Sequence, residues 1–72
     1  MMTVYDYKES LQVTKENYSF DAMLMALMWK ADSKNKAKIK AAWPEKVVEF
    51  KARSLCLGGV LPEEEEHFRS LA

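Results

Sequence analysis

One stretch of the sequence decides the fold class: Ser19-Phe-Asp-Ala-Met-Leu-Met-Ala-Leu-Met-Trp-Lys30. Ser19 is a typical N-cap residue, and Asp21 follows where the positive end of a helix favours an acidic side chain. Between Ala22 and Trp29 there is no polar residue. The stretch therefore predicts a helix from residue 20 to about residue 31 that is apolar on all sides.

The apolar residues of this helix fall into two stripes. The stripe expected to form the core consists of Phe20, Met23, Leu24, Leu27, Met28 and Ala31. The surplus stripe consists of Ala22, Met25, Ala26 and Trp29. A chain this short has few other apolar side chains with which to cover both stripes, so we expect an oligomer or a docking surface. Met25 and Trp29 are the candidates for partner binding on the surplus stripe.

Residues that start and end helices divide the sequence that follows. Asp32 or Ser33 is expected to cap a second helix, from Lys34 to about Trp43. A residue before proline avoids the helical conformation, so Trp43 ends this helix and Pro44 opens the next one. The third helix is expected to reach about residue 56. We expect Trp43 to be buried at the corner between the two helices.

The last elements follow from the only two glycines and the second proline. Gly58-Gly59 suits a left-handed cap and is expected to end the third helix. Pro62 begins a short fourth helix, with the acidic run Glu63 to Glu66 at its positive end and Arg69 in its last turn. We interpret the acidic run as a solvated first turn, because calcium would need more oxygen ligands at loop spacing.

The N-terminal segment shows no helical stripe. Residues 3–13 mix β-branched, aromatic and charged residues, so we expect an extended arm over residues 1–17. Such an arm forms an edge strand only with a partner, for example the same segment of a second chain. Residues 18–72 then make up the helical core. The sequence predicts a single all-α domain, a small three- to four-helix bundle with an extended N-terminal arm.

The formal net charge is zero, but the charges are segregated along the chain. From Trp29 to Arg53, eight basic residues stand against three acidic ones. Lys34 and Lys38 can share one helical face, and Arg53 offers the forked contacts that phosphates and carboxylates prefer. These three residues are candidates for binding an anion, which leaves an acidic protein surface, a nucleotide and a nucleic-acid backbone open. A lysine face that is merely solvated explains the same pattern.

Residues suited to catalysis are sparse. The single cysteine, Cys56, lies between two leucines, an apolar context that makes a thiol inert. The single histidine, His67, lies beside glutamates, and no phosphate-binding loop or HExxH motif occurs. We therefore expect no enzyme, no cofactor and no metal site. Because Met1-Met2 begins no signal-peptide pattern and no apolar run reaches ~18 residues, we expect a cytoplasmic protein without membrane contact.

A set of short motifs lies between residues 19 and 66: Ala31-Asp32, Asn35, Trp43-Pro44, Glu49, Arg53, Gly58-Gly59 and Leu61-Pro62. In this order they resemble a pattern in small uncharacterised proteins of bacteriophages and mobile elements. The run Leu55-Cys56-Leu57 departs from the more polar link of that pattern. The resemblance implies an accessory protein, since small phage genes of this kind often encode inhibitors or sequestering proteins aimed at host defence.

Three functional hypotheses follow. The first is a non-enzymatic phage-type accessory protein, an anti-defence inhibitor that acts by protein–protein interaction in the host cytoplasm, as a homo-oligomer or bound to a host protein. The second is an oligomeric sponge that sequesters a nucleotide or another anionic ligand, with lysines and Arg53 on its phosphates. The third is a small nucleic-acid-associated regulator, which steeply salt-dependent DNA binding would favour.

Overall fold

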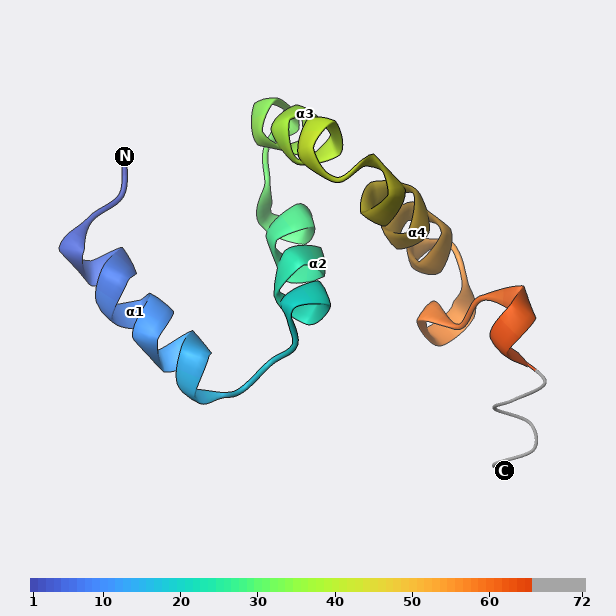
Figure 1. The fold of residues 1–72 in the computed structure, drawn as a ribbon, viewed down its shortest axis with the longest axis horizontal. Coiled ribbons are helices and arrows are strands. Elements are labelled where there is room, and N and C mark those ends of the chain that lie inside the picture. The colour runs from blue at the N-terminus through green and yellow to red at the C-terminus, as the bar shows by residue number, and fades with distance from the viewer. Residues whose placement is uncertain (66–72) are drawn as a thin grey trace. The chain divides into compact units, whose positions relative to one another are not determined.

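The computed structural model describes residues 1–65 of the 72-residue chain. Within this range the chain forms α1 (Val4–Lys15), α2 (Phe20–Lys30), α3 (Ser33–Ala42), α4 (Pro44–Ser54) and the two 3₁₀ helices η1 (Leu57–Gly59) and η2 (Pro62–Glu64) (Figure 1). Residues 1–65 contain no strand, so the predicted all-α class is confirmed. The chain divides into two compact units, Met1–Lys30 and Ala31–Ala72.

The prediction of an extended N-terminal arm is wrong, because residues 4–15 form α1. The helix begins with a capping box in which the Asp6 N–H donates to Thr3 Oγ1 at 3.1 Å. The Thr3 N–H donates in return to Asp6 Oδ2 at 2.9 Å. These two bonds satisfy amides that a helix start otherwise leaves open. Together with the absence of glycine and proline from the segment, they outweigh the strand preference of Val4 and Tyr5.

This cap makes α1 sensitive to a single hydroxyl. We expect Thr3→Ala to destabilise α1 by about 1 kcal/mol, because the first-turn amides lose their side-chain acceptor. Hydrogen exchange of the α1 amides measures this change. Thr14→Ala is the matched control, since Thr14 Oγ1 donates to the Ser10 carbonyl oxygen within the helix and caps nothing. Equal exchange in the two variants would contradict the role of the capping box.

The helix α2 begins as predicted, with the Ala22 N–H donating to Ser19 Oγ at 3.0 Å. Its burial differs from the prediction. In the expected core stripe only Leu24 and Met28 are buried, at 6% and 4% exposure. Met23 and Leu27 lie about 100° around the helix from these two and are exposed. The prediction that Met23 and Leu27 belong to the core is therefore wrong.

The unit Ala31–Ala72 begins with the α3–α4 corner. The Asn35 N–H donates to Asp32 Oδ1 at 2.8 Å, so Asp32, one of the two predicted caps, is the N-cap of α3. Trp43 ends α3 and Pro44 begins α4, also as predicted. The Trp43 N–H bonds to the Ile39 carbonyl oxygen, and the Val47 N–H bonds to the Trp43 carbonyl oxygen. The backbone of Trp43 therefore closes the last turn of one helix and the first turn of the next.

Among residues 31–65, the buried apolar side chains are Ile39 from α3, Val47 from α4 and Leu61 from the segment between η1 and η2. We expected Trp43 to be buried, but this prediction is wrong, because the residue is 36% exposed. Its neighbours one turn away on either side, Ile39 and Val47, are the side chains buried at this corner. The large indole is left at the edge of the core as a result.

Beyond α4 the chain reverses its direction. The helix ends at Ser54, two residues before the expected end, and Gly58 and Gly59 adopt left-handed conformations with φ of 63° and 72°. Glycine reaches this region without strain, so the predicted left-handed conformation of the pair is confirmed. Its predicted role as the cap of this helix is wrong, because Leu55 is the C-cap of α4 and the two glycines lie in η1. Pro62 begins η2. The expectations for Glu66, His67 and Arg69 lie outside the described residues.

Candidate functional site

The unit Met1–Lys30 exposes large apolar side chains on both of its helices. On α2, Phe20, Met23 and Leu27 are 61%, 41% and 51% exposed. Because they are spaced at i, i+3 and i+7, they form one ridge along the helix. We call these three residues the α2 ridge. Exposed apolar surface of this kind is a mark of an interaction site when it is contiguous.

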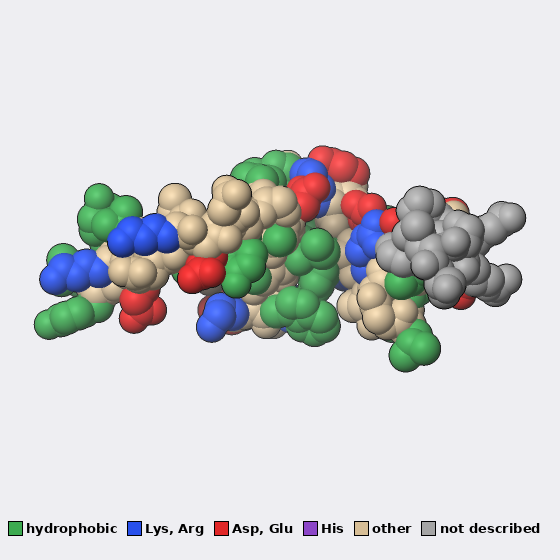
Figure 2. Space-filling model, turned by 90° about the horizontal axis from the view of Figure 1, so that it is seen from below, with side chains coloured by type: hydrophobic (Ala, Val, Ile, Leu, Met, Phe, Trp, Pro, Cys, Tyr) green, Lys and Arg blue, Asp and Glu red, His purple; other side chains and the backbone are tan. Residues whose placement is uncertain are grey.

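The same spacing recurs on α1. Val4, Tyr7 and Leu11 are 60%, 63% and 46% exposed and form the α1 ridge. None of the α1 residues is buried. Figure 2 shows apolar side chains at the surface beside lysines over α1, at the left of the view. The i, i+3 and i+7 spacing of this ridge is present in the sequence, but it indicates a common face only when the segment is helical.

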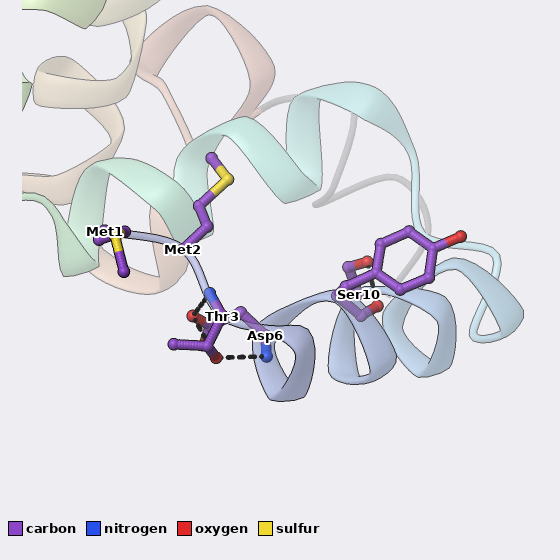
Figure 3. A pocket seen from close by; sticks show the side chains of 6 residues that line it. Met1, Met2, Thr3, Asp6 and Ser10 are labelled. Carbon is purple, nitrogen blue, oxygen red and sulfur yellow. Dashed lines mark hydrogen bonds between the residues drawn. The ribbon is translucent and has the colours of Figure 1, made fainter.

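A shallow hollow lies at the start of α1, lined by Met1, Met2, Thr3, Asp6, Tyr7 and Ser10 (Figure 3). Its polar side chains bond within the helix itself. Thr3 and Asp6 bond to each other in the capping box, and Ser10 Oγ donates to the Tyr7 carbonyl oxygen at 2.6 Å. The hollow is therefore formed by the start of the helix, where the side chains of Thr3, Asp6 and Ser10 are already hydrogen-bonded.

The predicted contact residues of α2 lie on the other side of this helix from the α2 ridge. Met25 is half-buried and Trp29 is 69% exposed. Their i, i+4 spacing places them on one face. Their role in partner binding stays a prediction.

Two of the basic candidates, Lys34 and Lys38, lie on α3, which carries four lysines and no acidic residue. These lysines are Lys34, Lys36, Lys38 and Lys40, and all of them are exposed. The nearest acid, Asp32, accepts the Asn35 N–H as N-cap. Within residues 1–65, none of the four lysines forms an ion pair. Lys34 and Lys38 lie within about 40° of each other around the helix, whereas Lys36 and Lys40 lie on its other side. We call Lys34 and Lys38 the α3 lysine face.

Arg53, the third basic candidate, is engaged by its own chain. Its Nη1 donates to Glu64 Oε1 at 2.8 Å and its Nη2 to Glu64 Oε2 at 3.1 Å, a forked pair. Nη1 also donates to the Gly59 carbonyl oxygen at 2.9 Å, and Nη2 to Glu49 Oε1 at 3.3 Å. Glu64 Oε1 accepts in addition the Leu61 N–H at 3.0 Å. We call this group the Arg53 clasp.

The Arg53 clasp changes the pKa of its arginine. The hydrogen bonds to Glu64 raise the pKa of Arg53, partial desolvation opposes them, and Glu49 adds to the increase. The guanidinium side chain is 28% exposed and that of Glu64 is 34% exposed. Interpreting the whole acidic run as solvated was therefore wrong for Glu64. The one available signal was Gly58-Gly59, which turns the chain after α4 back toward Arg53.

The five candidate residues are divided between the two units. Met25 and Trp29 belong to the unit Met1–Lys30, whereas Lys34, Lys38 and Arg53 belong to the unit Ala31–Ala72. Within the second unit, the two lysines share a helix face and Arg53 lies in the clasp. The part of the chain that the structure describes holds no group of three or more residues suited to a metal ion. None of the helices in residues 1–65 is long and apolar enough to cross a membrane.

Several of the short motifs noted in the sequence have structural roles in this unit. Asp32 caps α3, Trp43-Pro44 forms the corner, and Gly58-Gly59 reverses the chain. Glu49 and Arg53 belong to the clasp. These motifs therefore describe a framework, and they leave the lysine face and the apolar ridges as the surfaces available for function.

Comparisons with known proteins add no assignment to this geometry. No family model matches the chain, and neither a curated protein nor a solved structure is significantly similar to it.

Proposed function

We propose that this chain is a non-enzymatic binding protein whose α3 lysine face contacts an acidic surface on a partner protein. The observation that carries the proposal is the concentration of four exposed lysines on a ten-residue helix without a single acid. Lys34 with Lys38, and Lys36 with Lys40, are like-charge pairs at i, i+4, which destabilise a helix. An acidic partner would relieve this repulsion on binding.

A protein target suits this face better than a nucleotide or nucleic acid. Recognition of phosphate favours the forked contacts of arginine, and base recognition favours arginine or aromatic side chains. The α3 helix has neither residue type. Arg53, which we had considered for phosphate binding, already holds Glu64 in a forked pair. The sequestration of a nucleotide and the binding of nucleic acid therefore become the competing outcomes of the test.

The resemblance of residues 19–66 to small phage proteins supports a biological setting for this activity. A protein of that kind would act in the host cytoplasm as an accessory inhibitor, and its target would be a host defence protein. An inhibitor of this type needs no catalytic group, which agrees with the non-enzymatic proposal. Electrostatic complementarity of the α3 lysine face would mainly contribute speed and selectivity of association.

The test is charge reversal on α3. We expect wild-type protein to bind immobilised poly-L-glutamate in a salt-sensitive manner, because the Debye length shrinks to about 8 Å at physiological ionic strength. The double variant Lys34→Glu/Lys38→Glu should bind roughly tenfold more weakly, as expected for two reversed exposed contacts. Surface plasmon resonance measures both constants, and circular dichroism checks that the helix content is unchanged.

Matched controls separate a specific face from net charge. Lys51→Glu changes the charge by the same amount as Lys38→Glu, but at an exposed position on α4. Equal weakening by these two single variants would mean that only net charge matters and would overturn the proposal. Tighter binding to a DNA duplex or to a nucleoside triphosphate than to poly-L-glutamate would replace it with one of the alternatives. Proteins captured from host extract by wild type and lost in the double variant would then identify the target.

A further inference from the structure

The two apolar ridges of the unit Met1–Lys30 are exposed to solvent. Only Leu24 and Met28 are buried in these thirty residues, whereas all six ridge residues are at least 41% exposed. A segment below about 40 residues does not bury enough apolar surface to hold a fold without help such as oligomerisation. The ridges are the surfaces through which this unit would oligomerise.

The ridges match each other in spacing. In the α1 ridge the residues stand at positions 4, 7 and 11, and in the α2 ridge at positions 20, 23 and 27. Each ridge therefore extends over seven residues, about 10 Å of helix. In an antiparallel pair, Val4 lies opposite Leu27, Tyr7 opposite Met23, and Leu11 opposite Phe20. Each of the two aromatic side chains, Tyr7 and Phe20, then lies opposite a non-aromatic apolar one.

The helix dipoles favour this orientation. Antiparallel packing places the positive start of each helix beside the negative end of the other. The acidic residues of the first turns, Asp6 and Asp21, lie more than about 120° around their helices from the middle of the ridges and take no part in the contact.

We propose that a second copy of this chain covers the ridges, with α1 of each copy packed antiparallel on α2 of the other. This reciprocal contact is isologous and closes as a twofold dimer. Six half-exposed side chains, at roughly 100 Å² each, contribute about 600 Å² from each copy. The total of about 1,200 Å² reaches the lower limit of specific protein interfaces. The α3 lysine face takes no part in the contact, so this inference does not depend on the proposed function.

The first test is disulfide trapping in a Cys56→Ser background, which removes the single native thiol. After mild oxidation, Tyr7→Cys/Met23→Cys should give a covalent dimer on a non-reducing gel. Each single-cysteine variant is the control and should give at least about tenfold less. A double variant that becomes oxidised within one chain, with monomer mobility, would overturn the proposal. Equally rapid dimer formation by Met23→Cys alone would overturn the α1–α2 pairing, because it would place like helices in contact.

The second test is sedimentation of the unmodified protein. Wild type should sediment as a dimer at high micromolar concentration. Leu11→Glu and Leu27→Glu should each raise the dimer dissociation constant at least about tenfold while the far-ultraviolet circular dichroism shows retained helix. Val48→Glu introduces the same charge at a residue of α4 that is 68% exposed, and should leave the dimer intact. A wild-type protein that sediments as a monomer at high micromolar concentration would contradict the proposal. Lys34→Glu/Lys38→Glu should still form the dimer, so the two proposals fail separately.

Discussion

Ile39→Ala is expected to lower the free energy of unfolding by about 2–4 kcal/mol. Ile39 is 8% exposed and is the only residue of α3 that is buried. Its truncation therefore leaves a gap at the contact through which α3 packs against α4. A chain of this size has a total stability of only about 4–11 kcal/mol. Urea unfolding followed by circular dichroism should show a midpoint so low that part of the variant is unfolded without denaturant.

Two neighbouring valines provide the control for this prediction. Val47 is 7% exposed and Val48 is 68% exposed, and both lie on α4. Val47→Ala removes two buried methyl groups and should cost about 2 kcal/mol, whereas Val48→Ala should change the stability by less than about 0.5 kcal/mol. If both substitutions have the same small effect, the core does not lie on the Ile39–Val47 side of these helices.

Helix boundaries were predictable wherever a local signal fixed them. Ser19 and Asp32 supply side-chain caps, and Pro44 fixes the start of α4 within its own turn. The cap of α1 was equally local, since Thr3 and Asp6 are three residues apart. The β-branched and aromatic residues after Thr3 favour a strand and so obscure this signal in the sequence. Local hydrogen bonds decide such a segment when no sheet partner is available.

Burial was less predictable than helix position. The pattern of α2 permits any of its sides to face a core, and only packing selects Leu24 and Met28. Trp43 was expected inside because of its size, but Ile39 and Val47 occupy that corner. The exposure of Lys34 and Lys38 was predictable, since a short helix with four lysines must keep them in solvent.

The engagement of Arg53 could not be found from helix patterns. Glu49 lies four residues before it on α4, which is a local signal, but Glu64 lies eleven residues after it. The contact depends on how Gly58-Gly59 turns the chain. Arginine was expected to be available to a ligand because it suits phosphates. The same forked geometry suits an internal carboxylate equally well.

Arg53→Met is expected to detach the segment of residues 57–64 from the end of α4. The substitution keeps an unbranched side chain of similar length and removes the donors to Glu64 and to the Gly59 carbonyl oxygen. Glu64 is then left with the Leu61 N–H as its remaining partner in the clasp. Leu61 is 9% exposed and lies between Gly59 and Glu64, the two residues that Arg53 holds. Without these bonds its side chain should become more exposed to solvent. Limited proteolysis in residues 57–64 should become several-fold faster, because cleavage follows local opening.

The comparison variants show whether the forked bond itself matters. Arg53→Lys keeps the charge but cannot form two parallel bonds to one carboxylate, so it should restore little of the protection. Glu49→Gln removes only an ion pair at 3.3 Å whose carboxylate side chain is 56% exposed, and should have a small effect. Full protection in Arg53→Lys would show that charge alone holds the segment. The raised pKa of Arg53 gives stability that is present at all lower pH values and is lost only as strongly alkaline solution removes the proton. The arginine therefore stays charged across the neutral range, and the effect of Arg53→Met should be the same at pH 6 and pH 8.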